Sequence, residues 1–177
     1  MDYPEQVICS GKALIMTSNK QNISLRPTEL TDLATLFEFQ LDKEGAYLAA
    51  FMPIDATDKL AFITKHLKLL GEPTVNNQTV LLGDIIVGSI GKFEMEGKSE
   101  ITYWIDRKCW GQGIATIALK EFLLKEKARP MLGRVVFDNF GSQKVLEKCG
   151  FVKIGSDKGF AEARQAVVEE FIYRLDY

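Results

Sequence analysis

One segment constrains the fold more than any other, because two glycines in it join a strand-like run directly to a helix-like run. It extends from Tyr103 to Thr116 and reads YWIDRKCWGQGIAT, with Gly111 and Gly113 just before the expected helix. A turn of this kind presents unpaired backbone N–H groups at the positive end of the helix dipole. The segment is therefore a candidate anion-binding turn, although a glycine between a strand and a helix is also compatible with a plain turn.

Two common phosphate-binding patterns do not fit this segment. A dinucleotide fingerprint needs a third glycine where Thr116 stands, and an acidic residue about twenty positions later, where the chain has residues 131–133, MLG. A Walker loop needs four residues between its glycines and then Lys followed by Ser or Thr, and the segment has neither feature. A bound anion would instead be held mainly by the main chain, with the Thr116 hydroxyl as one further donor.

The rest of the chain alternates strand-like and helix-like patterns without an internal repeat or a linker. Three runs rich in β-formers, separated by glycine-containing turns, predict an antiparallel meander over residues 78–82, 85–94 and 100–105. Residues 42–55 are expected to be irregular. Helices are expected over residues 28–41, 57–70, 114–127 and 141–148, and further strands over 13–17, 23–26, 134–137, 151–155 and 167–175. The predicted fold is α+β in three layers, a central mixed, mostly antiparallel twisted sheet with helices on both faces.

The charge balance and the cysteines limit the kinds of partner. The 22 basic and 24 acidic residues give no broad positive field, so neither nucleic acid nor a membrane is expected as the main partner. Three cysteines without zinc-like spacing favour a reducing cytoplasm, and no apolar run approaches the ~20 residues of a membrane span. We expect an N-terminal extension over residues 1–22, packing on or near one domain formed by residues 23–177.

The glycine segment resembles the pyrophosphate motif of the GNAT superfamily of acyl-CoA N-acyltransferases, Gln/Arg-x-x-Gly-x-Gly/Ala. Residues 110–115, WGQGIA, match this motif with Trp110 in place of the Gln or Arg, and residues 139–151, NFGSQKVLEKCGF, match a second motif. With the strand 100–105, EITYWI, the pattern is most similar to the RimJ and RimL branch of ribosomal-protein acetyltransferases, where tryptophan at this position is common. The resemblance covers about residues 23–175.

The resemblance implies a GNAT-like fold and acetyl-CoA as the acetyl donor. Backbone groups near Trp104 and Ile105 would pair with the pantetheine arm like an added strand. Asn139 would contact that arm, and Ser142 would lie near the thiol. Many members use a tyrosine as general acid where this chain has Leu146, so Ser142 or a water must protonate the departing thiolate. The pyrophosphate would be held by the glycine turn, which we define as Gly111, Gln112, Gly113, Ile114, Ala115 and Thr116.

The reaction also needs a proton acceptor, because an ammonium group must become a neutral amine before it attacks the thioester. Glu100 is the first candidate because it begins the strand that leads to the glycine turn, although a solvated residue after the preceding turn fits the sequence equally well. Glu162 is a weaker candidate. His66, the only histidine, lies beside the apolar stripe of its helix formed by Leu60, Ile63, Leu67 and Leu70, so an ordinary surface position is expected.

Two further features have both a functional and a structural interpretation. Cys109 adjoins the glycine turn, but no His or Asn partner for a covalent relay lies nearby, so we expect it to pack beside Trp110. Residues 47–52 fit either an apolar wall of the acceptor site or simple loop packing. One histidine excludes a His-rich metal centre, and no metal is expected.

The sequence as a whole predicts a cytoplasmic, acetyl-CoA-dependent N-acetyltransferase. The acetyl group would pass to a primary amine, on a protein N-terminus or a small molecule, by direct attack in a ternary complex. The protein would act as a monomer or a homodimer. A catalytically silent CoA-binding or sensing module and a purely structural domain remain alternatives. Two expected loops, residues 42–55 and 156–166, would select the acceptor, but they contain no identifying motif.

Overall fold

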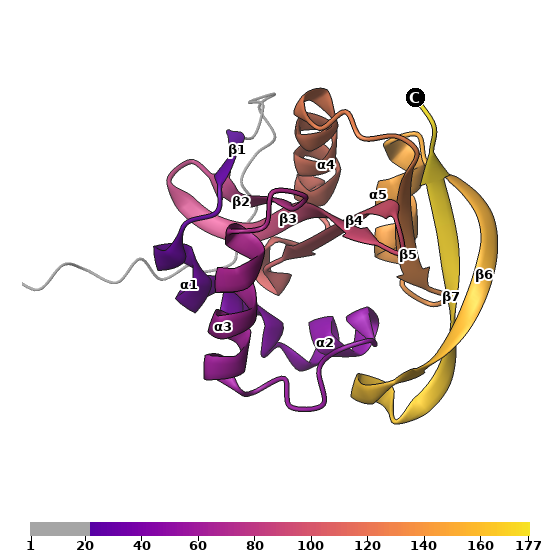
Figure 1. Ribbon diagram of the computed structural model, residues 1–177, viewed down its shortest axis with the longest axis horizontal. Coiled ribbons are helices and arrows are strands. Elements are labelled where there is room, and N and C mark those ends of the chain that lie inside the picture. Colours follow the sequence, from indigo (N-terminus) through magenta and orange to yellow (C-terminus); the bar gives the residue numbers. More distant parts are fainter. Residues whose placement is uncertain (1–21) are drawn as a thin grey trace, which may run out of the picture.

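The computed structural model describes residues 22–177, which form one mixed sheet with helices on both faces (Figure 1). The expected strand over 13–17 and nearly all of the 1–22 extension lie outside these residues. The strands run in the spatial order β1-β2-β3-β4-β5-β7-β6. They are β1 (Ile23–Pro27), β2 (Asn76–Leu82), β3 (Ile85–Met95), β4 (Lys98–Ile105), β5 (Met131–Val136), β6 (Val152–Ala161) and β7 (Ala166–Leu175).

The helices lie in two groups, with α1, α2 and α3 on one face of the sheet and α4 and α5 on the other (Figure 1). This arrangement confirms the expected α+β architecture. The helices are α1 (Leu33–Gln40), α2 (Lys43–Ala49), α3 (Lys59–Leu70), α4 (Ile114–Lys125) and α5 (Phe140–Lys148), and the short helical turns are η1 (Leu30–Asp32), η2 (Arg107–Cys109) and η3 (Glu162–Arg164).

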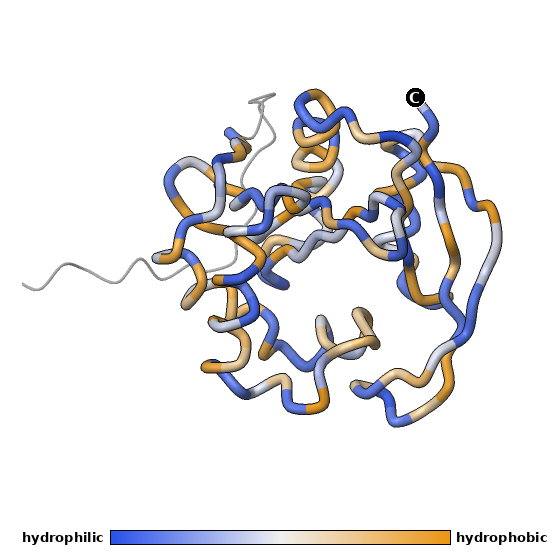
Figure 2. The backbone as a smooth tube through the Cα atoms, viewed as in Figure 1, coloured by the Kyte–Doolittle hydropathy of each residue, from blue (hydrophilic) through white to orange (hydrophobic). Residues whose placement is uncertain are grey.

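The main core lies between the sheet and the pair α4 and α5. Apolar side chains of α4 recur every three or four residues and meet alternate residues of the central strands, so both patterns bury one face. Burying each large side chain of this kind contributes roughly 1.5–3 kcal/mol. The most deeply buried members include Ile90, Leu119, Phe122, Met131 and Tyr173. Apolar segments also lie outside this core, as the orange stretches of the outer strand β6 show in Figure 2.

The connection before α1 is held to the sheet by a buried carboxylate. Asp32, 2% exposed, accepts hydrogen bonds at 2.6 and 2.7 Å from Arg26, at 2.9 Å from the Glu29 N–H and at 2.8 Å from the Thr79 hydroxyl. Burial alone would raise the pKa of Asp32, but these bonds outweigh it and lower the pKa to about 2. One charged side chain thereby ties α1 to β1 and β2.

The predicted meander of β2, β3 and β4 is confirmed. Two stretches that were predicted to be irregular contain regular secondary structure instead. Residues 42–55 contain α2, which the sequence hides because the helix is only seven residues long and includes Gly45. The Asp42 carboxylate caps it by accepting from the Gly45 N–H at 2.8 Å. Residues 156–166, taken as a loop, mostly continue β6 and begin β7, which pair as a hairpin through Ala161 and Ala166.

The orientation of α3 also differs from the prediction. Leu60 was assigned to its buried stripe, yet that side chain is 76% exposed, and Phe62 and His66 face inward instead. The Phe62 ring packs against Phe37 of α1 at a centroid distance of 5.4 Å, so an aromatic contact sets the rotation of the helix. His66 is therefore half-buried at the cavity and not on the ordinary exposed surface that the leucine stripe predicted.

Candidate functional site

The central feature of the site is a gap between two neighbouring strands. β4 and β5 are parallel and pair at three positions only, from Ser99 opposite Met131 to Ile101 opposite Gly133. Beyond that point β4 continues to Ile105 beside β3, while β5 continues beside β7, so the two strands separate. We call this region the strand split. It opens the sheet toward the glycine turn.

Alternate residues of β4 direct their backbone N–H and C=O groups either to β3 or to the strand split. The Asp106 N–H donates to the Val87 carbonyl of β3 at 2.8 Å, which fixes the hydrogen-bond alternation of this antiparallel pair. Counting back from Asp106, Trp104 exchanges bonds with β3, whereas Ile105 and Tyr103 direct their N–H and C=O groups toward the split. The main chain of Trp104 is therefore bonded to β3 and is not free for the expected pairing, whereas that of Tyr103 and Ile105 is directed to the split.

Trp110, which replaces the Gln or Arg of the family motif, changes this edge further. Its indole Nε1–H donates to the Ile105 carbonyl at 2.8 Å. That bond occupies one acceptor of the strand split and fixes the loop before the glycine turn. Tyr103 then becomes the β4 residue whose N–H and C=O both face the gap.

The glycine turn has the conformation required for an anion-binding helix start. Gly111 and Gly113 have φ values of 74° and 77°, in the left-handed region that residues with a Cβ avoid. Gly113 is the N-cap of α4 and has no side chain to bond the first-turn N–H groups of Ile114, Ala115 and Thr116. Gln112 is exposed and donates to the Lys108 carbonyl at 3.2 Å, outside the cavity wall. The binding capacity of the turn is therefore in its main chain.

The second motif forms the start of α5 on the other side of the strand split. The Asn139 Oδ1 accepts from the Ser142 N–H at 3.0 Å and caps the helix, while its Nδ2 donates to the Leu48 carbonyl of α2 at 3.2 Å. Asn139 thus lines the cavity as a structural joint between α5 and α2. Ser142, half-buried, also lines the cavity.

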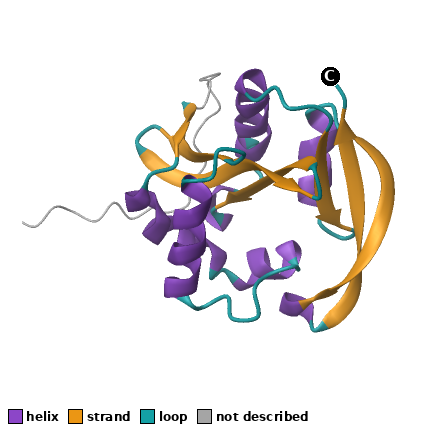
Figure 3. Cartoon of the chain, viewed as in Figure 1, coloured by secondary structure: helices purple, strands orange, loops and turns teal. Residues whose placement is uncertain are grey.

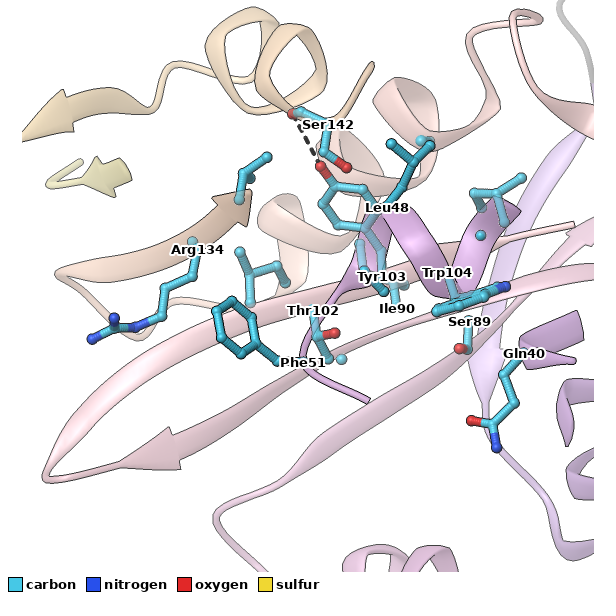
Figure 4. Close-up of a pocket in the computed structure, with 18 of the residues that line it drawn as sticks. Gln40, Leu48, Phe51, Ser89, Ile90, Thr102, Tyr103, Trp104, Arg134 and Ser142 are labelled. Carbon is cyan, nitrogen blue, oxygen red and sulfur yellow. Dashed lines mark hydrogen bonds between the residues drawn. The ribbon is translucent and has the colours of Figure 1, made fainter. Parts of the chain in front are cut away.

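One cavity of about 1670 Å³ passes along all these elements and continues to the α2 and α3 side of the sheet. It exceeds the roughly 300–1000 Å³ usual for a single small ligand. Figure 4 shows its centre, with Thr102 and Tyr103 on opposite sides of β4 and Tyr103 directed toward Ser142. Neighbouring strand residues point to opposite faces of the sheet, so β4 lines the cavity both on the α5 side and on the α2 and α3 side.

Sequence reasoning did not identify Tyr103 as a functional residue. Its side chain reaches the first turn of α5, where the hydroxyl donates to the Ser142 carbonyl at 3.2 Å. Burial raises the pKa of Tyr103 well above its usual value, so the phenol remains neutral. Leu146, at the position of the tyrosine acid in related enzymes, is fully buried beside Gly133.

The structure does not place Glu100 in solvent. The side chain is 4% exposed, and its Oε1 accepts from the Arg134 Nε at 3.1 Å. The same guanidinium donates to Glu170 at 2.8 Å and lies 3.6 Å from Asp157. Arg134 and Glu170 line the cavity and Glu100 does not, so the carboxylate contributes to the cavity electrostatics through Arg134.

His66 lines the cavity on the α2 and α3 side of the sheet. Its Nδ1 lies 2.8 Å from the Phe62 carbonyl, which can only accept, so the proton is on Nδ1 and Nε2 carries a lone pair. Burial lowers the pKa of His66, and Lys65 adds to this effect although the Phe62 carbonyl opposes it. The imidazole is therefore neutral near pH 7.

Cys109 packs against the main core and also borders the cavity. Burial raises the pKa of its thiol, so it does not resemble an activated nucleophile. Cys149 also packs against this core, where burial raises its pKa, and lies 3.6 Å from the Thr116 carbonyl.

The two segments expected to select the acceptor lie next to each other. The tip of the β6–β7 hairpin, η3, lies beside α2 (Figure 3), where the Ala163 N–H donates to the Ala50 carbonyl at 3.2 Å. Arg164 donates to the Tyr47 carbonyl at 2.8 Å and forms two 2.8 Å bonds with Asp138. We call α2, residues 50–52 and η3 the acceptor wall. Phe51 and Met52 line the cavity.

The sheet opens between two parallel strands beside a helix N-terminus without a side-chain cap, which gives a cavity with main-chain donors for an anion at one end. The chain belongs to the acetyltransferase (GNAT) domain family, whose model matches residues 22–152. Within residues 22–177, none of the helices is both long and apolar enough to cross a membrane.

One curated protein and two solved structures illustrate the likeness. The chain is 25% identical over 167 residues to the uncharacterized N-acetyltransferase p20 of Bacillus licheniformis, covering 88% of this chain and 93% of that one. The structure of Mycobacterium smegmatis RimJ in complex with CoA-disulfide matches with a TM-score of 0.70 and 21% identity over 87% of this chain and 81% of that one. The microcin C7 self-immunity acetyltransferase MccE, in complex with acetyl-CoA and AMP, matches with a TM-score of 0.72 and 16% identity over 90% and 94%.

Proposed function

We propose that this protein is an acetyl-CoA-dependent N-acetyltransferase acting on a primary amine of a protein N-terminus or a small molecule. The observation that carries the proposal is that one cavity joins the glycine turn, the strand split and the acceptor wall. Donor and acceptor can meet there for direct attack in a ternary complex. Family membership and the acetyl-CoA bound to MccE support the choice of donor. We further propose that the protein works in the cytoplasm as a monomer or a homodimer.

In this proposal the main chain binds most of the donor. The N–H groups of residues 111–116 hold the pyrophosphate, and the Tyr103 backbone pairs with the pantetheine arm. Phosphate at the N-terminus of α4 is favoured by the helix dipole. Ser142, at the first turn of α5, lies on the thiol side of the strand split and is the proposed proton donor.

The acceptor must lose a proton, and His66 is a better proton acceptor than Glu100. The Glu100 carboxylate is paired with Arg134 and does not line the cavity, whereas the neutral His66 imidazole does. Proton transfer from the amine to Nε2, directly or through water, leaves the amine lone pair free to attack. We expect that the acid limb in the pH dependence of kcat/KM is lost in His66→Gln and kept in Glu100→Gln. The reverse pattern would restore Glu100 as the base.

Binding and turnover experiments test the whole proposal. Acetyl-CoA at about 100 times its Kd should stabilise the protein by about 2.7 kcal/mol in a thermal-shift titration. Release of free thiol with a panel of amines and N-terminal peptides then tests catalysis. Stabilisation without thiol release would favour a silent CoA-binding module, and absence of stabilisation would exclude acetyl-CoA as the ligand.

A further inference from the structure

The hydroxyl of Tyr103 lies where the chemistry of the departing sulfur would take place. Tyr103 projects from β4 on the α5 side, lines the cavity, and donates to the Ser142 carbonyl at 3.2 Å (Figure 4). The contact crosses the strand split from β4 to the first turn of α5. Two hydroxyl groups, those of Tyr103 and Ser142, are thus carried by residues in direct contact within one cavity.

The position of the sulfur follows from the geometry of the strand split. The glycine turn lies beyond the C-terminal end of β4, so a pantetheine arm anchored there runs back along Ile105 and Tyr103. The strand split closes where Ile101 pairs with Gly133, two residues before Tyr103. The far end of the arm, which carries the sulfur, therefore lies beside the Tyr103 side chain. Leu146 is buried at this point and has no polar group to offer.

We propose that Tyr103 is a catalytic residue that donates a hydrogen bond to the CoA sulfur as the thiolate departs, and this rests on the proposed function. When the tetrahedral intermediate collapses, the C–S bond breaks and its electron pair stays on sulfur. The Tyr103 O–H turns from the Ser142 carbonyl to that sulfur and keeps its proton. Ser142 or water then delivers a proton that converts the thiolate to the thiol. The acceptor nitrogen releases one proton in the same reaction, so the protons balance.

The environment of Tyr103 suits a donor and excludes a base. The phenol keeps its proton across the working pH range because burial raises its pKa. The other titratable groups that act on it are Cys149 and Tyr173, and burial also raises the pKa of both, so they are neutral as well. A neutral donor next to a developing anion in a partly buried site stabilises the anion more than it would in water.

Tyr173 provides a matched control. It is a buried tyrosine of β7 on the same face of the sheet, and its hydroxyl also bonds α5, at 3.2 Å from the Glu147 Oε1. Unlike Tyr103, it does not line the cavity. Tyr103→Phe and Tyr173→Phe each remove one hydroxyl bond to α5, so a merely structural role predicts similar effects for the two variants.

The experiment measures the pKa of the CoA thiol in the binary complex, from the ultraviolet absorbance of the thiolate relative to the protein alone. We expect Tyr103→Phe to raise this pKa by about one unit and to lower kcat by about 10- to 100-fold with the best amine of the panel. Tyr173→Phe should change neither. 3-Fluorotyrosine at position 103, which keeps the shape of the side chain but donates more strongly, should lower the thiol pKa even if the Phe variant folds poorly.

The outcomes separate this inference from the proposed function. If CoA binds and both the thiol pKa and kcat are the same in Tyr103→Phe and the wild type, the role of Tyr103 is wrong while the acetyltransferase proposal stands. If the wild type fails to bind CoA, the proposed function fails, and this inference with it.

Discussion

The two halves of the cavity are built in different ways. The cofactor half uses β4, the glycine turn and α5, whose important groups are main-chain N–H and C=O groups set by local backbone conformation. The acceptor wall depends on side chains that meet across the chain, such as Arg164, which reaches the Tyr47 carbonyl 117 residues away. A short motif can therefore indicate the first half, whereas the second depends on tertiary contacts that no local pattern contains.

The largest expected effect is that of replacing Arg164, which should lower the stability of the protein and disturb the acceptor wall alone. Its side chain is 5% exposed, pairs bidentately with Asp138, and lies 4.0 Å from the centroid of the Tyr47 ring. Removing one partner of such a pair leaves the other uncompensated, so Arg164→Ala should destabilise the protein by about 3 kcal/mol in urea unfolding. In protein that remains folded, the KM of the acceptor should rise and the Kd of CoA should stay within a few-fold.

Arg174→Ala is the control for this variant. Its pair with Asp176 is nearly half exposed on both sides and should contribute less than about 1 kcal/mol. An equal loss of CoA affinity and acceptor affinity in Arg164→Ala would mean that the two halves are not independent.

The acid dependence of stability offers a second test, because Asp32 supports α1 on the acceptor side of the sheet. Its pKa is about 2 in the folded protein against 3.8 without the fold, so the unfolded chain binds the proton first. This contribution is full above pH 4 and is lost as the pH falls through about 2, which amounts to about 2 kcal/mol. Urea titrations between pH 2 and 5 should show this slope in the wild type and a reduced slope in Asp32→Asn. Asp84→Asn, at an exposed turn, should keep the wild-type slope.

A third variant pair addresses the cofactor half. Gly113 and Gly97 have similar φ values, 77° and 72°, and a Cβ at either position meets nothing within 4 Å. Gly113→Ala and Gly97→Ala should therefore each cost about 1–2 kcal/mol of stability. Only Gly113→Ala should weaken CoA binding in calorimetry, by at least about tenfold, because its added Cβ would crowd the phosphates that we propose approach the main chain of the glycine turn. Equal CoA affinities in the two variants would contradict the assignment of the glycine turn.

The sequence predicted those parts of the molecule in which local pattern and final contacts agree. The β2–β4 meander, α4 and α5 follow from apolar periodicity and glycine turns, and the family motif indicated the glycine turn where we propose that the phosphates bind. The side-chain alternation of β4 could also have been predicted from the sequence, because neighbouring strand residues such as Tyr103 and Trp104 lie on opposite faces. The motif drew attention to Trp104 and Ile105 instead.

The remaining errors come from contacts between distant residues. Glu100 follows a polar turn and was equally compatible with solvent, but Arg134, 34 residues later, buries and pairs it. His66 was placed on the surface because the leucine stripe of α3 suggested the wrong inner face, which the aromatic contact of Phe62 with Phe37 decides. Helix α2 was missed because its packing beneath Trp104, rather than its seven residues alone, stabilises it.

The smallest effect concerns a strained residue that holds the acceptor wall in place. Ala50 has φ 60° and ψ −57°, and the Phe51 N–H donates to the Ala49 carbonyl at 2.7 Å, which makes a γ-turn with positive φ. Such a conformation costs a residue with a Cβ roughly 1–3 kcal/mol. It persists here because Ala50 is completely buried and its carbonyl accepts from the Ala163 N–H.

Ala50→Gly should release this strain while losing a buried methyl group, worth about 0.8 kcal/mol, and adding the entropic cost of glycine, about 0.5–1 kcal/mol. The terms nearly cancel, so we expect a stability within about 1 kcal/mol of the wild type. Ala161 is equally buried in the same small apolar cluster but has an ordinary extended backbone, so Ala161→Gly should lose about 1.5 kcal/mol with no strain to release. The difference between the two variants in urea unfolding measures the strain at Ala50. Equal losses would show that the backbone at Ala50 stores no strain.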